Sequence, residues 1–127
     1  MKELVYIFIG GGAGSVLRYL AQIAINEQMS PLAFPFSWGT FSVNIFGSLL
    51  IGFFYSLSEH LHLSMDVRLF LTAGLCGGFT TFSTFSNDGL SLLKGEFYGT
   101  FLLYTLLSIG LGIAAVLLGG YIGKQIT

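Results

Sequence analysis

Four long stretches that carry almost no charge divide this chain of 127 residues. Each is close to or above the roughly 20 residues that an α-helix needs to cross the apolar core of a bilayer. Because lipid offers no hydrogen-bond partners, segments of this length are expected to be helices rather than barrel strands. The sequence therefore predicts an all-α integral membrane protein with four transmembrane helices in a single domain, residues 1–127. The spans are expected at about residues 4–26, 37–58, 67–93 and 97–123.

The composition favours lipid as the solvent for most of the surface. Only 9% of the residues are charged, against roughly 25% in a typical soluble domain. The net charge of −1 offers no basic surface for a nucleic acid. Cys76 is the only cysteine, which excludes an intrachain disulfide and a cysteine-rich metal site.

The basic residues are divided almost evenly between the two ends of the predicted bundle. Lys2, Arg68 and Lys124 lie at one end, and Lys94 lies at the other, joined by Arg18 if its side chain reaches that way. Three against one or two is a weak bias under the positive-inside rule. Such a chain can insert in both orientations, which would permit an antiparallel, dual-topology homodimer.

The chain holds 18 glycines, several of them spaced as GxxxG. Small residues at this spacing let membrane helices approach closely. We interpret most of them as packing positions within the protomer or dimer. The pairs are Gly10 and Gly14, Gly74 and Gly78, and Gly119 and Gly123.

The third stretch has the most unusual pattern for a membrane helix. Gly77 and Gly78 lie near its middle and are followed by FTTFSTFSN. Paired glycines weaken a helix, and hydroxyl side chains can satisfy the backbone groups that a break releases. We therefore predict that the third helix is broken around residues 77–80. The carbonyls that end its first half would suit a small cation, and the N–H groups that begin its second half would suit an anion. A kink filled by packing explains the glycines equally well.

Phe79, Phe82 and Phe85 recur every three residues, so on a continuous helix they lie near one face. A phenyl ring is electropositive at its edge, and ring edges along a path can favour an anion without offering a full charge. Phenylalanines at helical spacing are also typical of an apolar core. The neighbouring hydroxyl groups, which can replace part of the water around an anion, belong to Thr81, Ser83 and Thr84.

Other polar side chains lie inside or at the end of predicted spans. Asn44 offers two amide donors, either to an anion or to a neighbouring helix. Tyr104 and Ser108, four residues apart, form a ladder of hydroxyl donors or simply pack with satisfied hydroxyl groups. A charged arginine is costly in lipid, so the Arg18 side chain is expected to face protein or water. There it either attracts anions at a vestibule or anchors the chain locally. Asp88 can accept hydrogen bonds near the end of the third span.

The sequence shows no set of residues for catalysis. It has no Ser-His-Asp arrangement within reach and no pair of carboxylates inside a span. The glycine-rich segment at residues 10–14 lies in an apolar helix, not between a strand and a helix. We therefore expect that the protein is not an enzyme.

The segment 77–86, two glycines followed by FTTFSTFS, resembles the signature of the Fluc/CrcB family of fluoride ion channels. The glycine-rich run before Arg18 is similar to the family's first span, and Gly39 and Thr40 followed by Asn44 are similar to its second. The resemblance covers essentially the whole chain. It implies passive, fluoride-selective export from a microbial cytoplasm through the bacterial inner or plasma membrane.

The resemblance also implies an antiparallel, dual-topology homodimer with two pores, each lined by both subunits. A structural sodium ion would be held at the dimer interface by backbone carbonyls of Gly77 and Thr80. Arg18, Thr40 and Asp88 would either lie at a vestibule of the pore or help to hold the helices in place. Gly112 stands where relatives often carry a serine, so the polar track on the fourth span departs there. The implied pore residues are Asn44, Thr81, Phe82, Ser83, Thr84, Phe85, Tyr104 and Ser108.

The alternative is a small dual-topology multidrug exporter, which also has four spans and works as a dimer. That class couples protons to cationic drugs through a carboxylate inside the membrane. Here Glu3 and Glu27 flank the first span, and no carboxylate lies at its centre. A third possibility, an assembly subunit without transport activity, would leave the unusual third span unexplained.

Overall fold

The computed structural model describes residues 1–30 and 35–126, and all regular structure in these residues is helical. Three helices are long and apolar enough to cross a membrane: α1 (Lys2–Met29), α2 (Trp38–Leu61) and α6 (Tyr98–Ile126). Between α2 and α6 the chain forms a series of shorter elements. The parts of the predicted domain at 31–34 and 127 lie outside the described residues. The short elements are α3 (Met65–Leu69), the π-helical segment η2 (Phe70–Cys76), α4 (Gly77–Phe79) and α5 (Phe82–Lys94).

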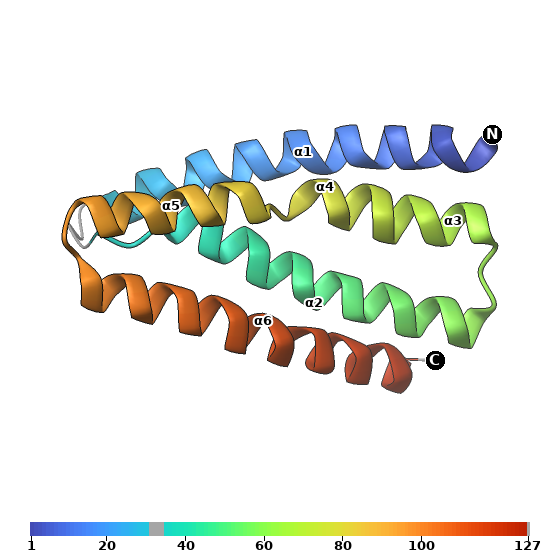
Figure 1. Ribbon diagram of the computed structural model, residues 1–127. Coiled ribbons are helices and arrows are strands. Elements are labelled where there is room, and N and C mark those ends of the chain that lie inside the picture. The colour runs from blue at the N-terminus through green and yellow to red at the C-terminus, as the bar shows by residue number, and fades with distance from the viewer. Residues whose placement is uncertain (31–34, 127) are drawn as a thin grey trace.

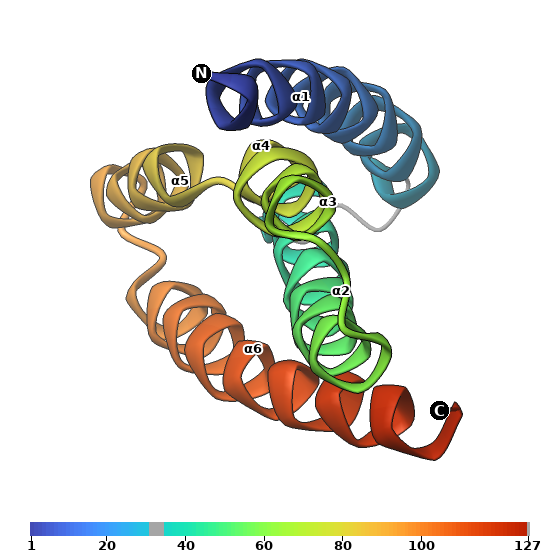
Figure 2. The same cartoon turned by 90° about the vertical axis from the view of Figure 1, so that its right-hand side faces the viewer.

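The helices form an elongated bundle in which the series from α3 to α4 runs beside α1 and α2, whereas α5 lies apart from α1 (Figure 1 and Figure 2). Both termini lie at the end of the bundle where α2 is followed by α3 (Figure 1). The opposite end holds the connection from α5 to α6. These apolar helices are those of an integral membrane protein.

Glycines allow the backbones of α1 and the η2–α4 segment to touch. A methyl group added at Gly10 would lie 2.6 Å from the carbonyl oxygen of Phe70, and one at Gly78 would collide with the carbonyl oxygen of Gly11. On α6, a methyl group added at Gly119 would collide with the carbonyl oxygen of Leu49 on α2. The interpretation of these glycines as packing positions is confirmed within the protomer.

Two extended residues, Thr80 and Thr81, separate α4 from α5. Thr80 has φ −93° and ψ 161°, and Thr81 has φ −151° and ψ 119°. The range predicted for a break, 77–80, overlaps this interruption only at Thr80, because Gly77 and Gly78 remain helical. Gly78 serves the close contact with α1 rather than an unusual backbone conformation.

Helix α5 starts immediately after the interruption. The Thr81 hydroxyl accepts a hydrogen bond from Thr84 N at 3.2 Å, which caps the helix. An end view shows α5 set to one side of α2 and α4, joined to α4 by the extended residues (Figure 2). The interruption therefore displaces the second half of the segment from the axis of the first half.

Candidate functional site

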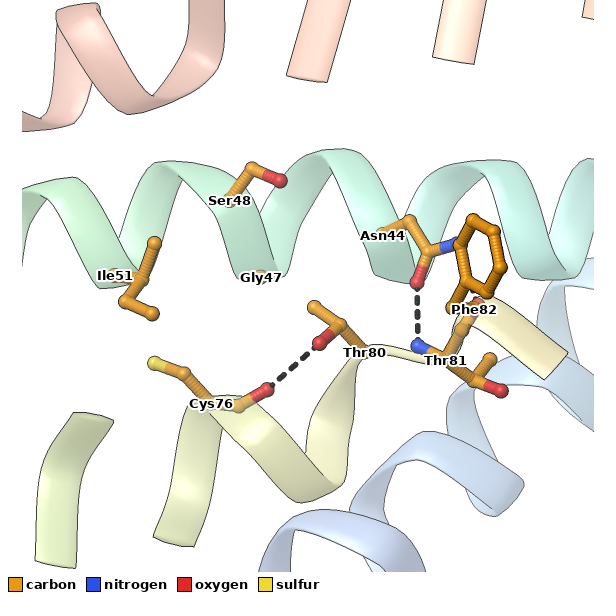
Figure 3. A pocket seen from close by; sticks show the side chains of 8 residues that line it. All are labelled: Asn44, Gly47, Ser48, Ile51, Cys76, Thr80, Thr81 and Phe82. Carbon is orange, nitrogen blue, oxygen red and sulfur yellow. Dashed lines mark hydrogen bonds between the residues drawn. The ribbon is translucent and has the colours of Figure 1, made fainter. Parts of the chain in front are cut away.

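A hollow of about 290 Å³ lies between α2 and the interruption (Figure 3). We call it the central hollow. Gly47 permits α2 to come close here, since a methyl group at this position would collide with the Thr80 side chain. The hollow is lined by Asn44, Gly47, Ser48, Ile51, Cys76, Thr80, Thr81 and Phe82.

Asn44 binds the backbone of the interruption through both ends of its amide. Its Oδ1 accepts a hydrogen bond from Thr81 N at 2.8 Å, and its Nδ2 donates one to Thr81 O at 3.1 Å (Figure 3). This pairing satisfies two backbone groups that the break releases from the helix. The Nδ2 group has two hydrogens, so one donor remains after this pairing.

Three hydroxyl groups gather at the start of α5. The Thr81 hydroxyl donates to Thr84 Oγ1 at 3.1 Å and lies 3.4 Å from Ser83 Oγ. Because the single hydrogen of the Thr81 hydroxyl goes to Thr84, Ser83 is the donor in its contact with Thr81, and only Thr84 has a hydroxyl hydrogen to spare. Thr80 is also committed, since its hydroxyl donates to the carbonyl of Cys76 at 3.1 Å.

The phenylalanine rings do not form one continuous face. Phe79 ends α4 and packs against Phe46, with ring centroids 6.0 Å apart, whereas Phe82 and Phe85 belong to α5. The expectation that all three share a face is wrong, because two extended residues intervene. The centroids of Phe82 and Phe85 are 5.9 Å apart, and the Phe82 ring is 79% exposed.

The two hydroxyl-bearing residues singled out on α6 have different surroundings. Tyr104 is fully buried, its ring lies 5.2 Å from that of Phe85, and its hydroxyl donates to Asp88 Oδ2 at 3.3 Å. Ser108 has a buried Oγ with no hydrogen-bond partner among the described residues. A free donor of this kind inside a bundle is available to a ligand.

A second cavity of about 340 Å³ lies on the other side of α5, and we call it the polar hollow. Thr40 on its wall is buried and accepts a hydrogen bond from Gln22 Nε2 at 3.1 Å. Arg18 lies elsewhere and donates from Nε to the carbonyl of Gly78 at 3.0 Å, next to the interruption. The polar hollow is lined by Tyr19, Gln22, Ile23, Asn26, Ser37, Thr40, Thr84 and Asp88.

The interruption also releases two carbonyl groups that suit a small cation. Thr81 N would close the next helical turn onto Gly77, but it donates to Asn44 instead. Thr84 N, which would close a turn onto Thr80, donates to the Thr81 hydroxyl. The carbonyls of Gly77 and Thr80 are thus groups of the kind that can bind a small cation. Among the described residues, no three His, Cys, Asp or Glu side chains cluster as a metal site.

Comparison with known protein families identifies the chain. The model of the family described as "CrcB-like protein, Camphor Resistance (CrcB)" matches residues 5–120. This chain belongs to the CrcB family. Membership agrees with the resemblance carried by the glycine and TTFSTFS motif.

Several curated relatives of the CrcB chain share the name "Fluoride-specific ion channel FluC". One from Bacteroides fragilis is 70% identical over 98% of each chain. One from Phocaeicola vulgatus is 56% identical over 94% of this chain and 96% of its own, and one from Flavobacterium psychrophilum is 44% identical over 99% and 100%. The family is one of multi-pass bacterial membrane channels and not of enzymes.

The spacing of Ser48 and Gly52 predicts a small-xxx-small packing pair in this CrcB-family chain, and no pore role for Ser48. In the structure Ser48 lines the central hollow. It follows Asn44 by four residues, so the two share a helix face. That spacing was a usable signal, although a serine in a membrane helix is more often a packing residue.

Proposed function

We propose that this CrcB-family protein is a fluoride-selective channel that lets fluoride leave the cytoplasm passively. The names of the relatives supply the ion. The observation that carries the proposal is the interruption at Thr80 and Thr81. It brings a helix start, the Asn44 amide and the exposed Phe82 ring to one hollow inside an apolar bundle.

The groups at this hollow suit a small anion. The start of α5 is the positive end of a helix dipole, and its first N–H groups are unpaired within the helix. Asn44 retains one amide hydrogen, and Thr84, on the neighbouring wall of the polar hollow, retains its hydroxyl hydrogen. Ring edges of Phe82 and Phe85 add weak positive potential without a fixed cation that would trap the ion. Fluoride needs several strong donors to replace its water, so such a path would favour it over the larger chloride.

The pore lining we propose joins these groups to α6. Fluoride would pass Asn44 and the start of α5, and then reach the hydroxyl groups on α6. Arg18, Thr40 and Asp88 would act at a vestibule or hold the helices in place. The full set of proposed pore residues is Asn44, Thr81, Phe82, Ser83, Thr84, Phe85, Tyr104 and Ser108.

We further propose that α3 to α5 form a fourth crossing and that two protomers pack antiparallel, giving two pores. One protomer leaves the Phe82 ring 79% exposed, so a second copy would be needed to enclose this ring in a pore. The nearly even charge of the two ends permits both orientations. A tag on the C-terminus, probed in cells with a membrane-impermeant reagent, tests this: about half of the tags should react, and a wholly one-sided result would contradict dual topology.

A sodium ion at the dimer centre would be coordinated by the carbonyl oxygens that the interruption releases. The carbonyls of Gly77 and Thr80 from both copies would bind it, and it would hold the two interruptions in register. Replacing sodium with a large organic cation on both sides of the membrane should lower fluoride flux. Unchanged flux would contradict the proposed role of sodium but not the proposal that the protein is a fluoride channel.

The channel itself is tested with purified protein in liposomes loaded with potassium fluoride. Valinomycin allows potassium to follow, and a fluoride electrode records release. We expect rapid release with no proton gradient. Release that appears only when a proton gradient is imposed would favour the proton-coupled exporter instead.

A further inference from the structure

We infer that the Ser48 hydroxyl is a further fluoride-binding group, placed between the Asn44 side of the route and the Ser108 side. This inference rests on the proposed function. Ser48 lies on α2 one turn after Asn44 and lines the central hollow. Figure 3 shows its hydroxyl pointing away from Thr80 and toward α6.

A gap on α6 faces this hydroxyl. A methyl group added at Gly112 would lie 3.7 Å from Ser48 Oγ, which is the nearest atom to it. Ser108 precedes Gly112 by one turn, so the two positions share a face of α6. Gly112 therefore leaves room for a small side chain beside Ser48, one turn from a serine whose own hydroxyl has no partner among the described residues.

The Ser48 hydroxyl is free to bind a ligand. Among the described residues it makes no hydrogen bond, not even to the carbonyl one turn earlier on its own helix, which a helical serine often uses. It can therefore donate its hydrogen to fluoride while Ser108 donates from the other helix. The geometry places a donor on α2 at the level where α6 has only a glycine.

The first test is Ser48→Ala, measured by fluoride release from liposomes. The matched control is Ser58→Ala on the same helix. Ser58 is 4% exposed and its hydroxyl also lacks a partner, but it does not line the central hollow. Loss of a hydrogen bond to an ion should reduce flux about tenfold in Ser48→Ala, while Ser58→Ala should stay close to the native rate.

A second variant separates ion binding from helix packing. Ser48→Ala combined with Gly112→Ser moves the hydroxyl from α2 to the facing position of α6, where the added side chain has ordinary contact distance. We expect this variant to recover most of the lost flux. Native flux in Ser48→Ala, an equal loss in Ser58→Ala, or no recovery in the double variant would each overturn the inference. Native protein that releases no fluoride would instead refute the proposed function on which it rests.

Discussion

The α2–α6 pair and the region around α5 differ in how closely their residues are packed within the protomer. On the α2–α6 contact, methyl groups added at Gly52 or Gly119 would collide with backbone carbonyls of the facing helix. Around α5, by contrast, Phe82 is 79% exposed and the Thr84 hydroxyl retains a free hydrogen. One region is closed by packing, and the other leaves groups available to an ion or to a second copy.

The difference teaches where stability and transport are separated in this fold. A membrane helix pair gains stability from close backbone contact, which glycines allow. A permeation path needs donors that are not already satisfied within the protein. Changes at the close glycine contacts of α2 and α6, Gly52 and Gly119, should therefore affect folding, and changes near the interruption should affect flux first.

The largest effect is expected from Gly119→Leu on the packed side. Its side chain would meet the Leu49 carbonyl and lie 2.9 Å from Phe53 N, so the helices must separate. We expect loss of folded protein, seen as aggregation in size-exclusion chromatography. Gly110→Leu is the control on the same helix, because nothing lies within 4 Å of its added methyl group. A well-folded Gly119→Leu protein would show that this contact is not needed.

Asn44→Ala should give the largest loss of flux among folded variants. It removes the remaining amide donor and both hydrogen bonds to Thr81. A hydrogen bond to a charged group contributes about 1.5–3 kcal/mol, which corresponds to roughly 10- to 100-fold in rate. The protein should remain folded by size-exclusion chromatography. Native flux in this variant would remove Asn44 from the pore.

Phe82→Ile tests the ring edges with a matched partner. Phe8 on α1 is as exposed as Phe82, at 82% against 79%. We expect Phe82→Ile to reduce flux about 2- to 10-fold, because ring interactions contribute about 0.5–1.5 kcal/mol. Phe8→Ile, on a lipid-facing helix, should release fluoride at the native rate. Equal behaviour of the two variants would argue that Phe82 only packs.

The smallest effect is expected on stability, from Thr81→Val. This change removes the cap of α5. Loss of a cap costs about 1 kcal/mol, so the unfolding temperature should fall by a few degrees. The control is Thr100→Val on α6, because the Thr100 side chain makes no hydrogen bond among the described residues. If both variants unfolded at the native temperature, Thr81 would not be an effective cap.

The same division explains what the sequence could predict. The length of the apolar stretches was sufficient to predict α1, α2 and α6. The spacing of the glycines was sufficient to predict that Gly10, Gly78 and Gly119 are packing positions, because both features depend on local pattern. The position of the interruption depends on a tertiary contact. Asn44, far away in sequence, pairs with the backbone of Thr81 and stabilises two extended residues beyond the glycines.

That shift also separated Phe79 from Phe82, which a helical repeat could not foresee. Ser48 was missed for a related reason. Its significance comes from the open space at Gly112 on another helix, and only the packing of α2 on α6 reveals that space. Pairings across helices were therefore the part of the site that spacing alone could not supply.

The most direct test of the central claim is the selectivity of the native protein in liposomes. Vesicles loaded with equal concentrations of fluoride and chloride, with valinomycin added, would be followed with an electrode for each ion. The account predicts rapid fluoride release with chloride release no faster than from empty vesicles. Equal release of both ions, or none from folded protein, would contradict it.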